Sequence, residues 1–122
     1  MKLLLAMSPT IFLMVYGQLI TKWKVQSLFE PAAGTSGAAS RLLLYLSDPY
    51  ILSAYLAAFV GSMAWMFVVE RNAISIAFPL YIGLTVVMVA IGGVVLFGEP
   101  MTASRVVSIV LILTGVAIGS RA

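Results

Sequence analysis

Residues 72–98, NAISIAFPLYIGLTVVMVAIGGVVLFG, contain no charged side chain over 27 positions. A helix needs roughly 20 mostly apolar residues to cross a bilayer, so this stretch is long enough to span one. Inside hydrocarbon only helices and closed barrels satisfy all their backbone groups, and the chain has no alternating strand pattern. The stretch therefore predicts a membrane-spanning helix.

Three further uncharged stretches have the same character, and nearly all the charges lie between the four. These stretches cover residues 3–21, 49–69 and 106–120. We therefore predict an all-α membrane protein that forms one domain over residues 1–122 and crosses the bacterial inner (plasma) membrane several times. The four transmembrane helices are expected at about residues 3–22, 49–69, 73–97 and 101–120.

The composition excludes several classes of function. Of the 122 residues 62% are hydrophobic and 9% charged, whereas soluble domains have about 25% charged residues. The chain has no cysteine and no histidine, which removes thiolate metal ligands and the commonest general base. Its net charge of +3 comes from scattered residues, without a basic run that would suit nucleic acid. We predict no enzymatic activity, no metal, no cofactor and no nucleic-acid partner.

Proline and glycine mark the expected breaks between helices. Residues 30–40, EPAAGTSGAAS, read as a linker, and residues 41–47 are too short to span, so they lie at the interface or extend the next helix. Asp48-Pro49 is a good helix start. Pro79 is expected to kink the helix over residues 73–97, and the small-residue motif Gly115-x-x-x-Gly119 to pack closely against another helix.

The loop charges do not set a clear orientation. With four spans, the side holding both termini has three Lys or Arg residues and the opposite side has four. The positive-inside rule needs a larger difference. The balance, and the small size of four helices, favour a homo- or heterodimer, with an antiparallel arrangement as one option. The alternative is that the small excess in one loop fixes a single orientation.

No acid or base lies at the centre of any expected span, where ionisable residues are usually functional. Gln18 is the polar side chain that helix 3–22 offers instead, and Lys22 lies four residues later on the same face. An amide with a cation suits a phosphate or a sugar phosphate near the interface. The alternatives are that Gln18 hydrogen-bonds a neighbouring helix and that Lys22 simply extends towards the head groups.

Further candidates lie in the other spans. Arg105 is either a second anion contact or another side chain that extends to the interface, while Glu99 is explained most simply as a favourable charge at the start of helix 101–120. Aromatic side chains are either substrate contacts or packing and lipid contacts. Pro79 frees backbone carbonyls, which usually face protein or a cavity. The substrate-contact candidates besides Gln18, Lys22 and Arg105 are Tyr16, Tyr55, Phe78, Pro79 and Tyr81.

Short motifs in this order resemble the four-helix form of the drug/metabolite transporter superfamily. They are GQLITK at residues 17–22, IAFP at 76–79, FGEP at 97–100 and the glycine-rich LTGVAIG at 113–119. Within that superfamily the chain resembles the small subunits assigned as flippases of aminoarabinose-phosphoundecaprenol. The resemblance implies transport of a polyprenyl-phosphate-linked monosaccharide across the inner membrane, with membrane lipid and a second subunit as partners.

The chain is also similar to the small multidrug resistance family, whose members have four helices and form antiparallel dimers. That family depends on a glutamate in its first helix, and alignment on Gly17 and Lys22 places Met14 there. Two alternatives to the flippase therefore remain: a small cation or drug exporter, which lacks its expected carboxylate, and a non-transporting membrane subunit of a glycosyltransferase system.

Overall fold

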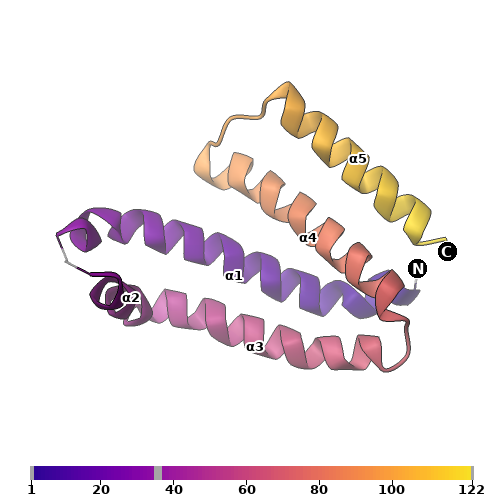
Figure 1. The fold of residues 1–122 in the computed structure, drawn as a ribbon, viewed down its shortest axis with the longest axis horizontal. Coiled ribbons are helices and arrows are strands. Elements are labelled where there is room, and N and C mark those ends of the chain that lie inside the picture. The colour runs from indigo at the N-terminus through magenta and orange to yellow at the C-terminus, as the bar shows by residue number, and fades with distance from the viewer. Residues whose placement is uncertain (1, 35–36, 122) are drawn as a thin grey trace.

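The computed structural model describes residues 2–34 and 37–121, and in these ranges the chain is helical without any strand (Figure 1). The helices are α1 (Lys2–Ala33), α2 (Ala38–Leu46), α3 (Pro49–Val69), α4 (Ile74–Phe97) and α5 (Ala103–Gly119). The prediction of an all-α protein is confirmed. By length and composition α1 (over Lys2–Phe29), α3 and α4 are candidate membrane spans, and α5 is a shorter apolar helix.

The helix ends are set by local chemistry that the sequence displays. The Asp48 carboxylate accepts hydrogen bonds from the backbone N–H groups of Tyr50 (2.8 Å) and Ile51 (3.3 Å) at the start of α3. Gly98 ends α4 with a φ of 64°, a left-handed conformation that suits glycine. Thr102 caps α5 by accepting from the backbone N–H of Arg105 at 3.3 Å.

The predicted linker over residues 30–40 is partly helical. Helix α1 runs on to Ala33, and α2 already begins at Ala38. Alanine has a high helix propensity, so the helix can continue beyond the apolar stretch. The fall in hydropathy therefore marks the expected end of the membrane-spanning part and not the end of the helix. Residues 41–47 do not extend α3, because Asp48 has an extended backbone (ψ 127°) between α2 and α3. Their position at the membrane interface stays a prediction.

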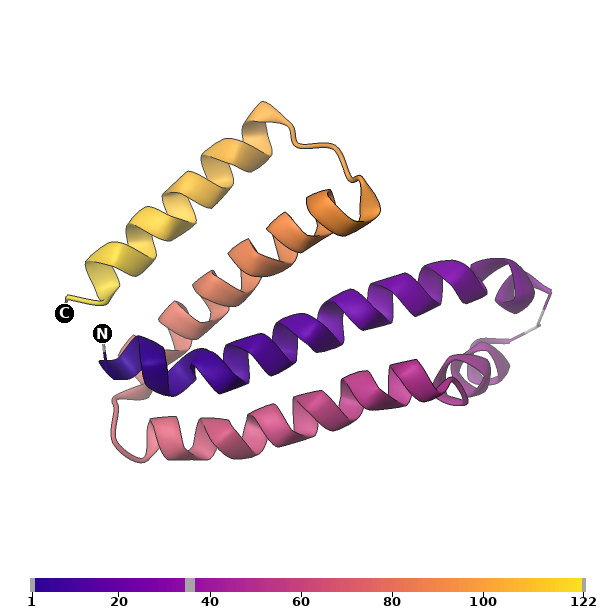
Figure 2. The ribbon, with the colours of Figure 1, turned by 180° about the vertical axis from the view of Figure 1, so that it is seen from behind.

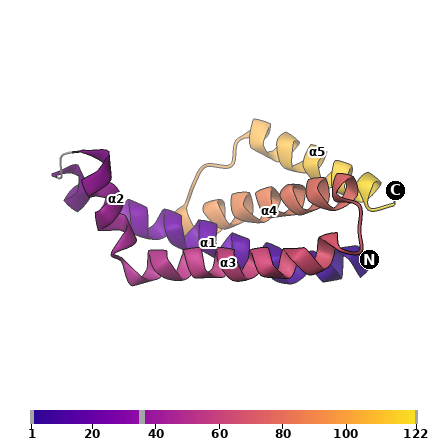
Figure 3. The ribbon, with the colours of Figure 1, turned by 60° about the horizontal axis from the view of Figure 1, so that its bottom comes forward.

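Helix α1 lies between α3 and α4, and α5 packs only on α4 (Figures 1 and 2). The start of α1 and the end of α5 lie at the same end of the molecule. The buried core joins α1, α3 and α4 near that end and consists of Met7, Ile11, Val15, Val68, Ala77 and Leu80. No residue of α5, which the structure describes in full, is buried, and Figure 3 shows α5 on the outer side of α4.

The two glycines of the predicted packing motif behave differently. A Cβ added at Gly119 would lie 3.2 Å from Leu80 Cδ2 of α4, whereas one added at Gly115 would meet nothing within 4 Å. Of these two glycines, Gly119 alone packs closely on α4. Helix α4 runs without interruption past Pro79, and the kink predicted there stays a prediction.

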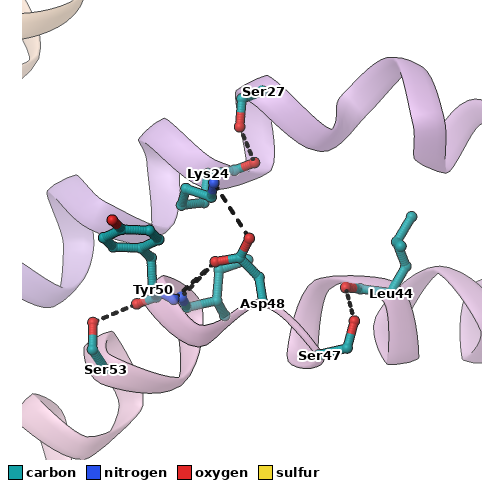
Figure 4. Close-up of polar contacts among 8 residues, drawn as sticks. Lys24, Ser27, Leu44, Ser47, Asp48, Tyr50 and Ser53 are labelled. Atoms are coloured by element: carbon teal, nitrogen blue, oxygen red, sulfur yellow. Dashed lines mark hydrogen bonds and ion pairs between the residues drawn. The ribbon is translucent and has the colours of Figure 1, made fainter.

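A cluster of charge and aromatic rings joins the polar end of α1 to the start of α3 (Figure 4). Lys24 Nζ lies 3.3 Å from Asp48 Oδ2 and 5.1 Å from the ring centroids of both Trp23 and Tyr50. The two rings pack edge to face at 5.4 Å. Trp, Tyr and Lys are typical of the membrane–water interface, so we expect this cluster to lie at that level on α1.

Replacing Asp48 with Asn is expected to lower the thermal unfolding midpoint at pH 7. Desolvation raises the pKa of Asp48, but the hydrogen bonds from Tyr50 and Ile51 and the Lys24 ammonium together hold it below 3.8. The ionised carboxylate therefore stabilises the fold above pH 3.8, and this contribution is lost as the pH falls through the lowered pKa. Circular dichroism melts in detergent between pH 2 and 7 measure it.

The matched control for that substitution is Glu70→Gln, because Glu70 pairs only with its exposed neighbour Arg71, at 3.6 Å. We expect the gap between wild type and D48N to close at the lowest pH, and the control to melt with the wild type throughout. A D48N protein that melts like the wild type at pH 7 would contradict a stabilising role for Asp48.

Candidate functional site

Three charged side chains, from α1, from the α4–α5 connection and from α5, lie close together where α4 turns into α5. Lys22 Nζ of α1 lies 4.0 Å from Glu99 Oε1, and Arg105 Nη1 of α5 lies 4.0 Å from Glu99 Oε2. The side chains of Lys22 and Arg105 are about half exposed, at 53% and 51%, and that of Glu99 is 37% exposed. We call these three residues the charge cluster. It brings together the two cations predicted as anion contacts.

Glu99 has a different position from the one the sequence suggested. Thr102, and not Glu99, is the N-cap of α5, and the favourable effect of the Glu99 charge on that helix stays a prediction. The Glu99 carboxylate instead lies over Gly93 near the end of α4, where an added Cβ would come within 2.6 Å of Oε2. The backbone N–H of Glu99 donates to the Gly93 carbonyl at 3.3 Å. Glycine at position 93 makes room for the carboxylate.

Arg105 is held at the mouth of the α4–α5 turn by a second contact. Its Nη1 donates a hydrogen bond to the Pro100 carbonyl oxygen at 2.8 Å. The remaining guanidinium donors are available to a ligand, because Arg carries five N–H groups in a planar fork. The arrangement therefore presents a pre-positioned cation beside Glu99.

Gln18 lies one turn before Lys22 on α1 and is exposed. No hydrogen bond joins its amide to another described residue, so the predicted bond to a neighbouring helix is not present there. Its side chain lines two grooves. One, of about 220 Å³, lies between α1 and α3 and includes Met14 and Tyr55, and the other, of about 370 Å³, lies between α1 and α4. The amide is thus free to bind a ligand.

Thr85 of α4 is a residue that sequence reasoning missed. It lines the α1–α4 groove with Gln18, and its Oγ1 is buried without a hydrogen-bond partner among the described residues. Buried hydroxyls usually find a partner, often the carbonyl four residues earlier. The sequence does not single out Thr85, because a lone Thr in an apolar span normally bonds the carbonyl four residues earlier in its own helix.

The groove beside Gln18 and the groove between α4 and α5 share lining residues of α4. Val86 and Ala90 line both the Gln18 groove and a groove of about 240 Å³ that contains Glu99 and Arg105. A larger apolar groove of about 550 Å³ shares Val86 and passes Pro79 towards Gly119. We call these connected grooves the α4 furrow. Its polar residues are mainly Gln18 and Thr85 in one groove and Glu99 and Arg105 in another, whereas the largest groove is mostly apolar.

The predicted aromatic residues divide into two groups. Tyr55 lies in a groove with Gln18, whereas the Tyr16 hydroxyl is hydrogen-bonded to Ser53 Oγ of α3 at 2.9 Å. Phe78 and Tyr81 instead pack with Trp65 of α3, with ring centroids 6.3 and 4.9 Å from the Trp65 ring. The structure therefore brings Tyr55 to Gln18 and places Phe78 and Tyr81 in an aromatic contact between α3 and α4.

Two known proteins are similar to most of this chain. Over 100 residues it is 30% identical to the probable 4-amino-4-deoxy-L-arabinose-phosphoundecaprenol flippase subunit ArnE of Pseudomonas savastanoi pv. phaseolicola, covering 82% of this chain and 81% of that protein. The protein of the same name from Pseudomonas syringae pv. syringae is also 30% identical, over 82% and 83%. The chain belongs to the ArnE flippase subunit family.

Membership of the ArnE family confirms the resemblance seen in the sequence. Both relatives are named as subunits of a transporter and not as enzymes. With its long apolar helices, the chain is a multi-pass protein of the bacterial inner membrane. No family model matches the chain. No solved structure matches it either.

Proposed function

We propose that this chain is a subunit of a flippase that moves a polyprenyl-phosphate-linked monosaccharide across the inner membrane. The observation that carries the proposal is that Lys22 and Arg105 both lie 4.0 Å from Glu99, which lines the α4 furrow together with Arg105. The names of the two ArnE relatives describe a lipid with the same division, a sugar phosphate joined to a long polyprenol.

The polar head group is handled at the charge cluster. Lys22 lies next to the interface marked by Trp23 and Lys24, which is the depth at which a lipid phosphate rests. Lys22 and Arg105 bind the phosphate, and Gln18, one turn deeper, bonds the sugar with Thr85 and Tyr55 nearby. These contacts replace part of the water that the head group loses, which lowers the cost of moving it through hydrocarbon.

The polyprenyl tail stays in the bilayer along the α4 furrow. Pro79, Gly83 and Ile112 give this surface an apolar lining between α4 and α5. We propose that α5 is the fourth transmembrane helix. Its 17 residues extend about 26 Å, close to the hydrocarbon thickness of about 30 Å. A tail held in lipid needs no enclosed channel.

A proton-coupled drug exporter fits the chain less well. Met14 occupies the position where the related exporters have their glutamate, and it lines the groove beside Gln18. Asp48, Glu70 and Glu99 all lie at helix ends. Without a titratable group in the middle of a span, we propose exchange driven by the gradient of the lipid-linked sugar.

We also propose that the chain works with a second membrane chain, identical or different. Helix α5 has no buried residue, and its outer face includes the exposed Val107, Leu111 and Ile118. Because α5 packs only on α4, the single chain leaves the α4 furrow open on one side. A partner that covers this side would exclude lipid from the head group while it crosses.

Replacing Gln18 with Leu is expected to slow translocation of a lipid-linked sugar about tenfold, the cost of a lost hydrogen bond to a polar ligand. The measurement follows a labelled polyprenyl-phosphate sugar across inside-out inner-membrane vesicles from cells that express each variant. The matched control is Gln26→Leu, because Gln26 lies two turns further along α1 and is exposed. Equal rates for Q18L and wild type would remove Gln18 from the site.

A further inference from the structure

The Glu99 carboxylate lies in an electrostatically unfavourable position near the end of α4, with a cation on either side. It lies against Gly93 in the last turns of α4, where the helix dipole places negative charge. Lys22 and Arg105 approach opposite carboxylate oxygens at 4.0 Å, and all three side chains are more than one-third exposed. Exposed pairs at this distance are weak. A ligand with matching charges can therefore replace them.

We propose that Glu99 recognises a cationic group on the transported head group, so that a phosphodiester carrying an amine is preferred over one carrying a neutral sugar. This inference rests on the proposed function and adds its specificity-determining residue. The arrangement of charge is a carboxylate with a cation on either side. A zwitterionic head group has the complementary pair of charges.

Binding of a phosphate explains why the amine matters. When Lys22 and Arg105 turn to a phosphate, Glu99 loses the two groups that held it and lies close to a second anion. A sugar ammonium restores a partner for the carboxylate, whereas a neutral sugar leaves it unpaired and repelled. Specificity then follows from a penalty against the neutral head group as much as from attraction to the amine.

Two other carboxylates are committed elsewhere. Asp48 caps α3 and pairs with Lys24 at 3.3 Å. Glu70 pairs with Arg71 at the far end of α3. Glu99 is placed differently, because it borders the α4 furrow with Arg105 and lies near Gln18 through the shared lining residues Val86 and Ala90.

The test compares two lipids that differ only in the charge of the sugar. The probes are undecaprenyl phosphate carrying 4-amino-4-deoxy-L-arabinose and the same lipid with its amine acetylated, bound to the full chain in nanodiscs and measured by native mass spectrometry. We expect the wild type to prefer the free amine about tenfold, as for one charge-assisted hydrogen bond. In E99Q the preference should fall to less than about twofold.

The acetylated lipid also reports whether the variant is folded, because E99Q should bind it at least as well as the wild type does. The control E70Q should keep the full preference. An E99Q protein that still prefers the amine overturns the inference, and so does a wild type that binds both lipids equally, although the flippase proposal then stands. A wild type that binds neither lipid overturns both.

Discussion

Replacing Lys22 with Ala is expected to slow movement of a polyprenyl-phosphate sugar about ten- to a hundredfold, because an unpaired phosphate loses a charge-assisted contact. Lys22 lies 4.0 Å from Glu99 and one helical turn beyond Gln18 on α1, which places its ammonium beside both candidate groups. The rate is measured with a fluorescent analogue of the lipid in inner-membrane vesicles, and it is normalised to the amount of folded protein.

The neighbouring cation Lys24 provides the matched control. It leaves α1 only two residues later but pairs with Asp48 and lies over the rings of Trp23 and Tyr50, away from the charge cluster. K24A should therefore weaken the fold and leave the rate per folded molecule near that of the wild type. If K22A and K24A slow transport equally, the effect belongs to the surface charge, and the assignment of Lys22 is rejected.

The helical regions could be predicted from the sequence because hydrocarbon imposes a simple rule on composition. A chain without charge over 27 residues has few other structures available, and the Asp48-Pro49 start is visible as a motif. The end of α1 was harder to predict. Helix α1 continues to Ala33 because backbone hydrogen bonding does not stop where the lipid does.

Half of the candidate site was visible in one helix, and half depended on tertiary structure. The four-residue spacing of Gln18 and Lys22 places them on one face of α1 by helix geometry alone. Their meeting with Arg105 through Glu99 requires the end of α4 to lie beside α1. The sequence did contain one indication of this meeting, because the four predicted spans place Lys22, Glu99 and Arg105 on the same side of the membrane.

The small residues also show that a sequence pattern within one helix does not predict its contacts with other helices. The GxxxG spacing in α5 singled out Gly115 and Gly119, but a Cβ at Gly115 would meet nothing within 4 Å, whereas Gly17, which no packing motif indicated, lies against the α3 backbone. Which small residue permits close approach depends on where the neighbouring helix crosses, and spacing along one helix does not contain that information.

Replacing Gly17 with Leu is expected to destabilise the chain by about 1–3 kcal/mol, the usual cost of overpacking. A Cβ at this position would lie 3.1 Å from the Ala54 carbonyl oxygen, tighter than ordinary contact. That oxygen belongs to the backbone of α3 and cannot rotate away, so α1 and α3 must separate. Unfolding is measured by titration from mild detergent into sodium dodecyl sulfate, followed by Trp fluorescence.

Gly115→Leu is the matched control for unfolding, because a Cβ there meets nothing within 4 Å and the side chain enters the groove between α4 and α5. It should unfold with the wild type and leave helix content unchanged, while G17L unfolds at a lower fraction of sodium dodecyl sulfate. Gly17 also lines the groove beside Gln18, so G17L should slow transport even where it remains folded. If G17L and G115L unfold alike, α1 and α3 do not depend on close backbone contact, and the packing described for this pair is wrong.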